Sequence, residues 1–84
     1  MQQRLLTTPS QAVQALVSRR KARKITQGVV ASRLGISQSR LSEIETRPET
    51  MTLDRLLAIT QMLELEIVIR EKSDGVQTPL KSEW

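Results

Sequence analysis

The side chains of this sequence that could do chemistry are hydrogen-bonding groups gathered in the middle of the chain. They are Ser37, Gln38, Ser39, Arg40 and Ser42. Hydroxyl, amide and guanidinium groups recognise hydrogen-bonding partners. The chain has no histidine and no cysteine to supply the commonest general base, a thiolate nucleophile or the usual zinc ligands. The sequence therefore predicts a recognition surface, and we expect no enzymatic activity, metal, cofactor or small-molecule substrate.

This group of side chains suits the pattern that base pairs present in the major groove of DNA. Glutamine can bond bidentately to adenine, arginine to guanine, and serine to a base or a phosphate. Gln27 and Arg47 are candidates for phosphate contacts, and we expect Gln27 to point its amide outward from the first position of a helix. The residue types thus favour binding to double-stranded DNA.

Two carboxylates, Glu43 and Glu45, follow the polar group on the same predicted helix. Side chains two positions apart on a helix do not face each other, so this pair does not suggest acid–base catalysis. We expect each carboxylate to lie on the solvated surface or to pair with Arg40 or Arg47.

The elements that must position these groups are four helices, each announced by a capping residue. Thr8-Pro9-Ser10-Gln11 is a capping box with proline at the first helical position, and Thr26, Ser37 and Thr52 are the other N-caps. The predicted helices run over 9–22, over 27–34, from 38 to about 45, and from 53 to about 63. Gly35 is the expected left-handed stop of the second helix.

Three of the helix starts carry a matching pair of apolar residues around the cap. The pairs are Ile25 with Val30, Ile36 with Leu41, and Met51 with Leu56. Each pair fits a hydrophobic staple, which fixes the angle at which the chain enters a helix. The repeated spacing supports the helix boundaries to within a residue or two.

The second and third predicted helices form a helix-turn-helix, because Ala31 allows close approach and Gly35 permits a sharp turn. The buried inner faces of the two helices would be formed by apolar residues, which are Val30, Leu34, Ile36, Leu41 and Ile44. A helical hairpin in some other small bundle is the alternative. The polar face described above is left exposed at the start of the third helix.

After the fourth helix the pattern changes to the alternation of a strand. Leu65, Ile67 and Ile69 alternate with Glu66, Val68 and Arg70. A lone strand cannot satisfy its backbone groups, and the short stretch Arg4-Leu5-Leu6-Thr7 is the only other candidate partner in the chain. Pairing with the same strand of a second copy is simpler. We therefore predict a homodimer whose interface contains Leu65, Ile67, Val68 and Ile69.

The size of the chain also favours a dimer, because 84 residues without disulfides bury a marginal core. We expect one domain over 1–71, with residues 72–84 as a flexible polar tail. No apolar run approaches the roughly 20 residues that span a bilayer. The N-terminus lacks a signal peptide's apolar segment, so a cytoplasmic location is the default expectation.

Charge divides the sequence into a basic front and an acidic rear. The first 47 residues hold nine basic and two acidic side chains, which gives +7, and the remainder holds four basic and seven acidic ones, which gives −3. A basic front half predicts a polyanionic partner, and the acidic rear leaves room for a second partner. The alternative is that the charge only keeps a small domain soluble.

The central motif also resembles a known family. Gln27 at the start of the second helix, the turn Leu34-Gly35-Ile36-Ser37, and the end Ser42-Glu43-Ile44-Glu45 are similar to the phage-repressor (Cro/C1, XRE) helix-turn-helix. The resemblance covers about 9–63. It implies a mostly α, lambda-repressor-like domain of four to five helices with one C-terminal β-strand pairing across a dimer. It also implies base contacts from Ser37, Gln38, Ser39 and Ser42, and phosphate contacts near Gln27 and Arg47.

A narrower resemblance rests on three further features. They are the start Thr8-Pro9-Ser10-Gln11, the strand sequence over 63–69 directly after the last helix, and the ending Glu83-Trp84. Together they resemble the HipB-type antitoxins of type II toxin–antitoxin pairs. That resemblance implies a dimeric repressor that binds the operator upstream of its own genes and holds a HipA-like kinase toxin, with Trp84 as an anchor in the toxin-binding tail.

Three alternatives stay open at this point. Trp84 could be an accidental terminal residue, since its tail is otherwise polar. The chain could be a stand-alone regulator of the phage or restriction-control type, without a toxin partner. It could also be a protein-interaction module that does not bind DNA. A HipA-like kinase encoded beside this reading frame would favour the antitoxin.

Overall fold

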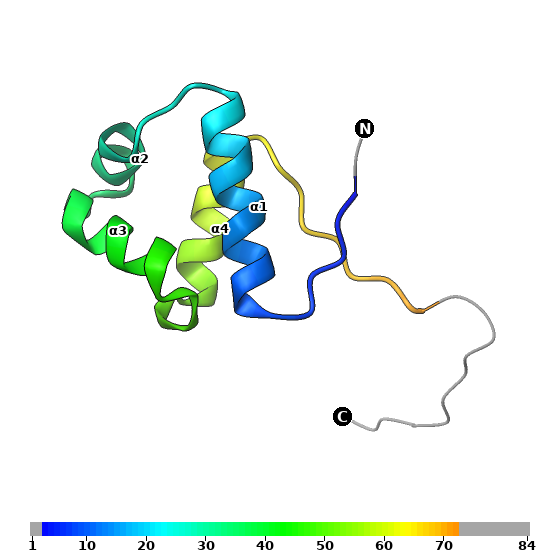
Figure 1. Cartoon of the computed structure of the whole chain (residues 1–84). Helices are drawn as coiled ribbons and strands as arrows, with labels where there is room; N and C mark the ends of the chain where they lie inside the picture. The colour runs from blue at the N-terminus through cyan, green and yellow to red at the C-terminus, as the bar shows by residue number, and fades with distance from the viewer. Residues whose placement is uncertain (1–2, 73–84) are drawn as a thin grey trace.

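The computed structural model describes residues 3–72, and these form a small helical domain (Figure 1). Its elements are α1 (Pro9–Ala22), α2 (Gln27–Leu34), α3 (Gln38–Thr46), the short 3-10 helix η1 (Pro48–Thr50) and α4 (Leu53–Met62). The predicted bounds of the first two helices are confirmed. The third helix ends one residue later and the fourth one residue earlier than expected, and η1 was not predicted. None of the helices described is long and apolar enough to cross a membrane.

Each α-helix begins at the hydroxyl residue that the sequence predicts. The side chains of Thr8, Thr26, Ser37 and Thr52 each accept a hydrogen bond from the backbone N–H three residues further on, at 3.0–3.2 Å. These bonds satisfy donors that have no partner inside the helix. At α1, Oε1 of Gln11 accepts a hydrogen bond of 2.7 Å from the backbone N–H of Thr7, which is the residue before the N-cap Thr8.

The core is formed by small and medium aliphatic side chains from all four α-helices. The buried apolar residues are Ala12, Val13, Leu16, Val30, Ala31, Leu41, Ile44, Ile59 and Leu63. The outer members of the three predicted staples, Ile25, Ile36 and Met51, are partly buried and pack against this cluster. The staples therefore close the core at the points where the chain enters α2, α3 and α4.

The helices divide the domain into two sides. In Figure 1, α2 and α3 lie on one side of α1 and α4, and the segments that precede α1 and follow α4 lie on the other. The surface at the start of α3 is therefore well separated from the segment proposed for dimerisation.

The predicted strand after α4 is not formed within residues 3–72, the part of the chain that the structure describes. The backbone N–H of Leu65 bonds to the carbonyl of Thr60 at 2.8 Å, and no described residue beyond Leu65 makes a backbone–backbone hydrogen bond. The physical reason is that a strand needs a neighbouring strand for its backbone hydrogen bonds. Residues 4–7, the candidate partner, do not pair with residues 65–70. Pairing across a dimer stays a prediction. Trp84 and the predicted tail beyond residue 72 lie outside the described residues.

Candidate nucleic-acid interface

The turn between α2 and α3 directs the third helix away from the second. Gly35 has φ +74°, in the left-handed region that glycine adopts most easily, and apart from its two chain neighbours no residue has an atom within 4 Å of the place where a Cβ would stand. The N–H of Ile36 donates to the carbonyl of Ala31 at 3.0 Å. Ala31 itself is buried, which permits the close approach of the two helices. This confirms the predicted helix-turn-helix geometry.

The polar residues predicted as base contacts lie together on the first turns of α3. Ser37, Gln38 and Ser39 are exposed, whereas Arg40 and Ser42 are half-buried. The apolar residues of the same helix, Leu41 and Ile44, point into the core. Burial of these two side chains fixes the rotation of α3 and leaves its polar face to solvent.

Ser37 and Arg40 already have partners on α3 itself or at its cap. The Ser37 hydroxyl accepts from the backbone N–H of Arg40 at 3.0 Å, so its oxygen caps α3 while its hydrogen remains available to donate. The Nη1 of Arg40 lies 2.8 Å from Oε1 of Glu43, which confirms the expected pairing of that carboxylate. Gln38 also bonds to another side chain, that of Gln27, so Ser39 is the least committed of the exposed side chains on this face.

Gln27 departs from the sequence expectation, because its amide nitrogen does not point outward. Its Nε2 donates to Oε1 of Glu45 at 2.7 Å, and the residue is half-buried. Its Oε1 accepts from Nε2 of Gln38 at 3.4 Å. Gln27 thus links α2 to the polar face of α3, and only its backbone keeps the predicted position at the helix start.

Glu45 is also placed differently from the expectation that it would be solvated or pair with Arg40 or Arg47. It pairs with Arg20 of α1, whose Nε is 3.2 Å from Oε2 and whose Nη2 is 3.3 Å from Oε1. The two side chains are only 12% and 16% exposed. Sequence reasoning missed this pair because its members are 25 residues apart and no local spacing connects them.

Arg47, the other predicted phosphate contact, lies in the turn between α3 and η1. Its side chain is 65% exposed, and its Nε is 3.9 Å from Oε2 of Glu49. A pair so long and so exposed restrains the guanidinium weakly. Arg47 is therefore available at the surface next to the end of α3.

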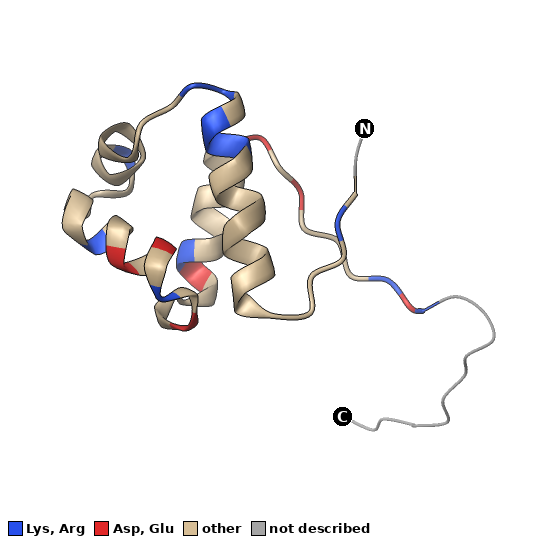
Figure 2. Ribbon diagram, in the orientation of Figure 1, with Lys and Arg blue, Asp and Glu red and all other residues tan. Residues whose placement is uncertain are grey.

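The basic residues near the end of α1 fall into two groups. Arginines bond to groups on other elements, and lysines make no such contact with a described residue. Figure 2 shows them gathered at the end of α1 and in the loop that follows. Arg19 donates from Nε to the carbonyl of Leu63 at 2.9 Å, and Arg23 donates to Glu64 at 2.8 Å. These arginines hold the end of α4, so the net charge of the front half overstates the charge available to a partner.

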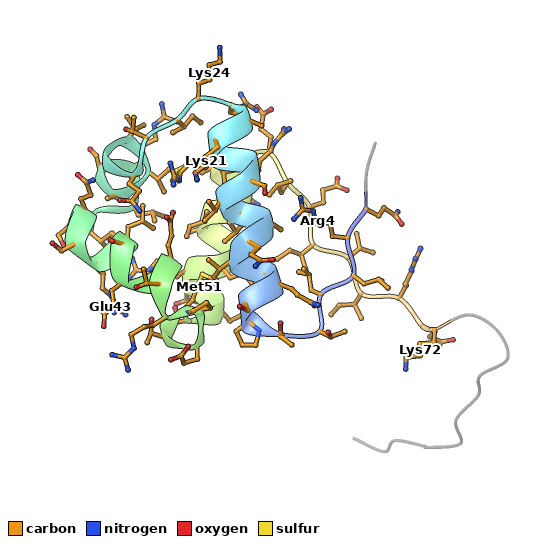
Figure 3. All side chains as sticks on the ribbon, in the orientation of Figure 1. Arg4, Lys21, Lys24, Glu43, Met51 and Lys72 are labelled. Carbon is orange, nitrogen blue, oxygen red and sulfur yellow. The ribbon has the colours of Figure 1, made fainter. Side chains whose placement is uncertain are left out.

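Lys21 and Lys24 differ from these arginines, because they make no side-chain hydrogen bond or ion pair with any described residue. Lys24 follows α1 with φ +58°, and its side chain points away from the helices (Figure 3). The sequence showed only a basic cluster, and the structure separates these two lysines from the arginines with tertiary partners. The lysines add positive charge beside the start of α2.

Comparison with known families agrees with this geometry. A family model described as Helix-turn-helix matches residues 16–69, which is more than half of the chain and includes all of α2, α3 and α4. Searches of curated proteins and of solved structures find no match. Among residues 3–72, no group of three or more acidic side chains stands close enough to hold a metal ion.

Proposed function

The chain belongs to the helix-turn-helix family of DNA-binding transcription regulators, of the Cro/C1 (XRE) type, and from this premise we propose that it is a sequence-specific repressor that inserts α3 into the major groove. The observation that carries the proposal is the polar first turn of α3, which stays exposed while Leu41 and Ile44 hold the other side of the helix in the core. This arrangement suits a recognition helix.

The residues divide between base and phosphate contacts. Gln38, Ser39 and Ser42 read base edges, with Ser37 donating its hydroxyl hydrogen and Arg40 reaching a guanine if it leaves Glu43. Arg47 contacts a phosphate beyond the end of α3. Because the Gln27 amide nitrogen is held by Glu45, the phosphate contact at the start of α2 comes from free backbone N–H groups there.

A salt-dependent fluorescence anisotropy titration tests this proposal, with the DNA upstream of the chain's own gene as probe and a scrambled duplex as control. We expect tight binding to the upstream site and a steep loss of affinity as salt rises, because phosphate contacts release counterions. Equal and weak binding to both duplexes would contradict sequence-specific repression and favour a protein-interaction module.

We propose further that the chain is a homodimer joined through residues 65–69. Val68 and Ile69 are 71% and 94% exposed, and the backbone of this segment has no partner beyond Leu65 in the described part of the chain. Exposed apolar residues beside unpaired backbone groups favour the addition of a strand from a second copy. A dimer also presents two α3 helices to two half-sites about 10 base pairs apart, or a multiple of that spacing.

Within the repressor proposal, we propose the role of antitoxin in a type II toxin–antitoxin pair, repressing its own operon and binding a HipA-like kinase toxin. The support is the resemblance carried by residues 8–11, residues 63–69 and the ending Glu83-Trp84. Trp is enriched among the hot spots of protein interfaces, so Trp84 is the residue proposed to contact the toxin.

Co-expression with a kinase encoded next to this reading frame tests the antitoxin role. We expect the two proteins to co-purify, and we expect Trp84→Ala to weaken the complex while Glu83→Ala, the matched control, does not. Failure of the wild-type chain to hold the kinase, together with intact operator binding, would favour a stand-alone regulator.

A further inference from the structure

We propose that Glu45 is a positioning residue for DNA recognition, which acts through Gln27 to set the direction in which the Gln38 amide faces the groove. The inference rests on the proposed function, because it assigns Glu45 a part in how Gln38 reads a base. Glu45 is too enclosed to touch DNA itself, since its side chain is only 16% exposed.

The contacts form a continuous chain from α1 to the recognition surface. Arg20 holds Glu45 through two contacts of 3.2 and 3.3 Å. Glu45 accepts from Nε2 of Gln27 at 2.7 Å, and Oε1 of Gln27 accepts from Nε2 of Gln38 at 3.4 Å. Three elements therefore determine the environment of one exposed amide.

The chemistry of the groups fixes the direction of every link. An ionised carboxylate only accepts hydrogen bonds and a guanidinium only donates them, so Gln27 must turn its NH₂ group toward Glu45. Its oxygen then faces Gln38 and favours the NH₂ group of that residue. The orientation of both amides thus follows from the charge of Glu45.

The anchored end of this chain is more rigid than its exposed end. Nη1 of Arg20 also donates to the carbonyl of Ile25 at 3.0 Å, and the Arg20 side chain is only 12% exposed. The last link, at 3.4 Å, is longer than an ordinary N–H···O bond. Glu45 therefore biases the Gln38 amide toward one orientation and does not lock it.

The bias matters because a glutamine that recognises adenine uses both the oxygen and the NH₂ group of its amide. Adenine offers one donor and one acceptor in the major groove, so a reversed amide presents each group to the wrong partner. Oε1 of Gln38 lies 3.6 Å from the place where a Cβ on Gly28 would stand. Gly28 itself therefore places no side-chain atom beside that oxygen.

The first test replaces Glu45 by glutamine and measures base preference. The probe is the duplex that the wild-type chain enriches from a randomised pool, compared with duplexes that carry each single-base substitution. The introduced glutamine would accept from Arg20 and offer its NH₂ group to Gln27, which reverses both amides beyond it. We expect Glu45→Gln to reduce the preference at the position read by Gln38 by about 5-fold or more, the lower end for one bidentate pair.

Glu64→Gln is the matched control, because Glu64 also pairs with an arginine, Arg23 directly after α1, and makes no side-chain hydrogen bond or ion pair with a described residue of α3. We expect it to keep the wild-type preference. Gln27→Met provides a second variant, since it cuts the chain of contacts while leaving the Arg20–Glu45 pair in place. It must also lower the preference, even if Glu45→Gln proves too unstable to assay.

A reciprocal exchange separates orientation from packing. In the double variant Glu45→Gln with Gln27→Glu, the introduced glutamine of α3 donates to the introduced carboxylate of α2, and that carboxylate again presents an acceptor to Gln38. We expect the exchange to restore the preference for the wild-type base, although the total affinity changes. Loss of preference in Glu45→Gln without recovery in the double variant would overturn the proposal, and so would an unchanged preference in Glu45→Gln.

A measurement on the free protein keeps this proposal distinct from the proposed function. The two side-chain N–H signals of Gln38 in a ¹H–¹⁵N spectrum should shift in Glu45→Gln and return in the double variant. A wild-type chain with no base preference at all would contradict the proposed sequence-specific repression. In that case the Gln38 signals alone decide whether Glu45 orients the amide. If the Gln38 signals do not respond to Glu45→Gln, the proposal that Glu45 orients the Gln38 amide is overturned.

Discussion

At the scale of single residues, identical side-chain types do different work according to the neighbours that the fold provides. Ser37 caps α3, whereas Ser39, two positions later, is exposed and makes no side-chain hydrogen bond with a described residue. Arg20 forms a largely buried ion pair with Glu45, whereas the side chain of Arg47 is exposed at the surface. A DNA-contact assignment therefore has to be made residue by residue, from what each side chain already binds.

Gln38→Ala should selectively weaken binding to the preferred duplex. Loss of a bidentate base contact costs about 1–3 kcal/mol, while contacts to phosphates are retained. The measurement is anisotropy with the preferred and a scrambled duplex at the same salt concentration. Arg47→Ala is the control, because loss of a phosphate contact weakens both complexes and lowers the salt dependence. Equal weakening of both complexes by Gln38→Ala would contradict its role in base reading.

The two glycines of the helix-turn-helix should respond oppositely to alanine. At Gly28, in α2, a Cβ would meet its nearest atom at 3.6 Å, an ordinary contact, so Gly28→Ala should stabilise the fold by about 0.5–1 kcal/mol. At Gly35, φ +74° penalises any Cβ, so Gly35→Ala should destabilise by about 1–2 kcal/mol. Urea denaturation of both variants measures these changes. Destabilisation of equal size at both positions would contradict the argument.

The residue scale also shows where sequence reasoning succeeds. The capping role of Ser37 and the left-handed Gly35 were predictable, because each depends on neighbours within four positions. The pairing of Arg20 with Glu45 was not, because it depends on how α1 crosses α3. The inward turn of the Gln27 amide follows from that same pairing, and for this reason it was also missed.

At the scale of elements, one arginine in the last turn of α1 and one directly after α1 connect this helix to the end of α4. Arg19 donates to the carbonyl of Leu63, the residue that ends α4, and thereby satisfies a free carbonyl of that helix. Arg23 donates to Glu64, the next residue, which has φ +59°. The basic cluster at the end of α1 thus also fixes how the chain leaves the domain.

The Arg23–Glu64 connection should make stability depend on pH in the acid range. The hydrogen bond from Arg23, and then its charge, lower the pKa of Glu64 from the usual 4.5. A lowered pKa in the folded state means that the contribution is complete above 4.5 and disappears as the pH falls through the lower, folded value. Glu64→Gln should therefore reduce the urea midpoint slightly at neutral pH and not at all in strong acid.

Glu66→Gln is the control for this measurement, since Glu66 is exposed and has no ion pair with a described residue. The expected effect of Glu64→Gln is small because the carboxylate is on the surface, where water screens the pair. A difference between Glu64→Gln and the wild type that persists unchanged in strong acid would show that the ion pair is not its cause.

The elements themselves were largely predictable, with one exception that has a physical cause. Caps and staples are local signals, so the starts of all four α-helices were found at the right residues. The alternation over 65–70 indicated a strand, yet that segment makes no ladder within the described part of the chain. An alternating pattern reports which faces can be buried, and it does not report which chain supplies the partner.

At the scale of the whole molecule, the two proposed interfaces lie on opposite sides of α1 and α4. The recognition surface at the start of α3 is on one side, and the extended segment after α4 leaves on the other (Figure 1). Two copies joined through their extended segments can therefore keep both α3 helices accessible. This separation allows the strength of dimerisation and the base contacts to be changed independently.

Ile69→Lys should convert the dimer to a monomer without disturbing the fold of either copy. Ile69 is 94% exposed in the single chain, so lysine there removes no contact within the domain but places a charge in the proposed strand pair. Light scattering should give half the wild-type mass, and binding to paired half-sites should fall to that of one half-site.

Leu53→Lys distinguishes this interface from a second apolar surface. Leu53 is 69% exposed at the start of α4, far along the chain from residues 65–69. If copies associate through the extended segment, Leu53→Lys keeps the dimer mass and the preference for paired half-sites. If Leu53→Lys dissociates the dimer and Ile69→Lys does not, the dimer forms through α4, and the alternation over 65–70 has another purpose.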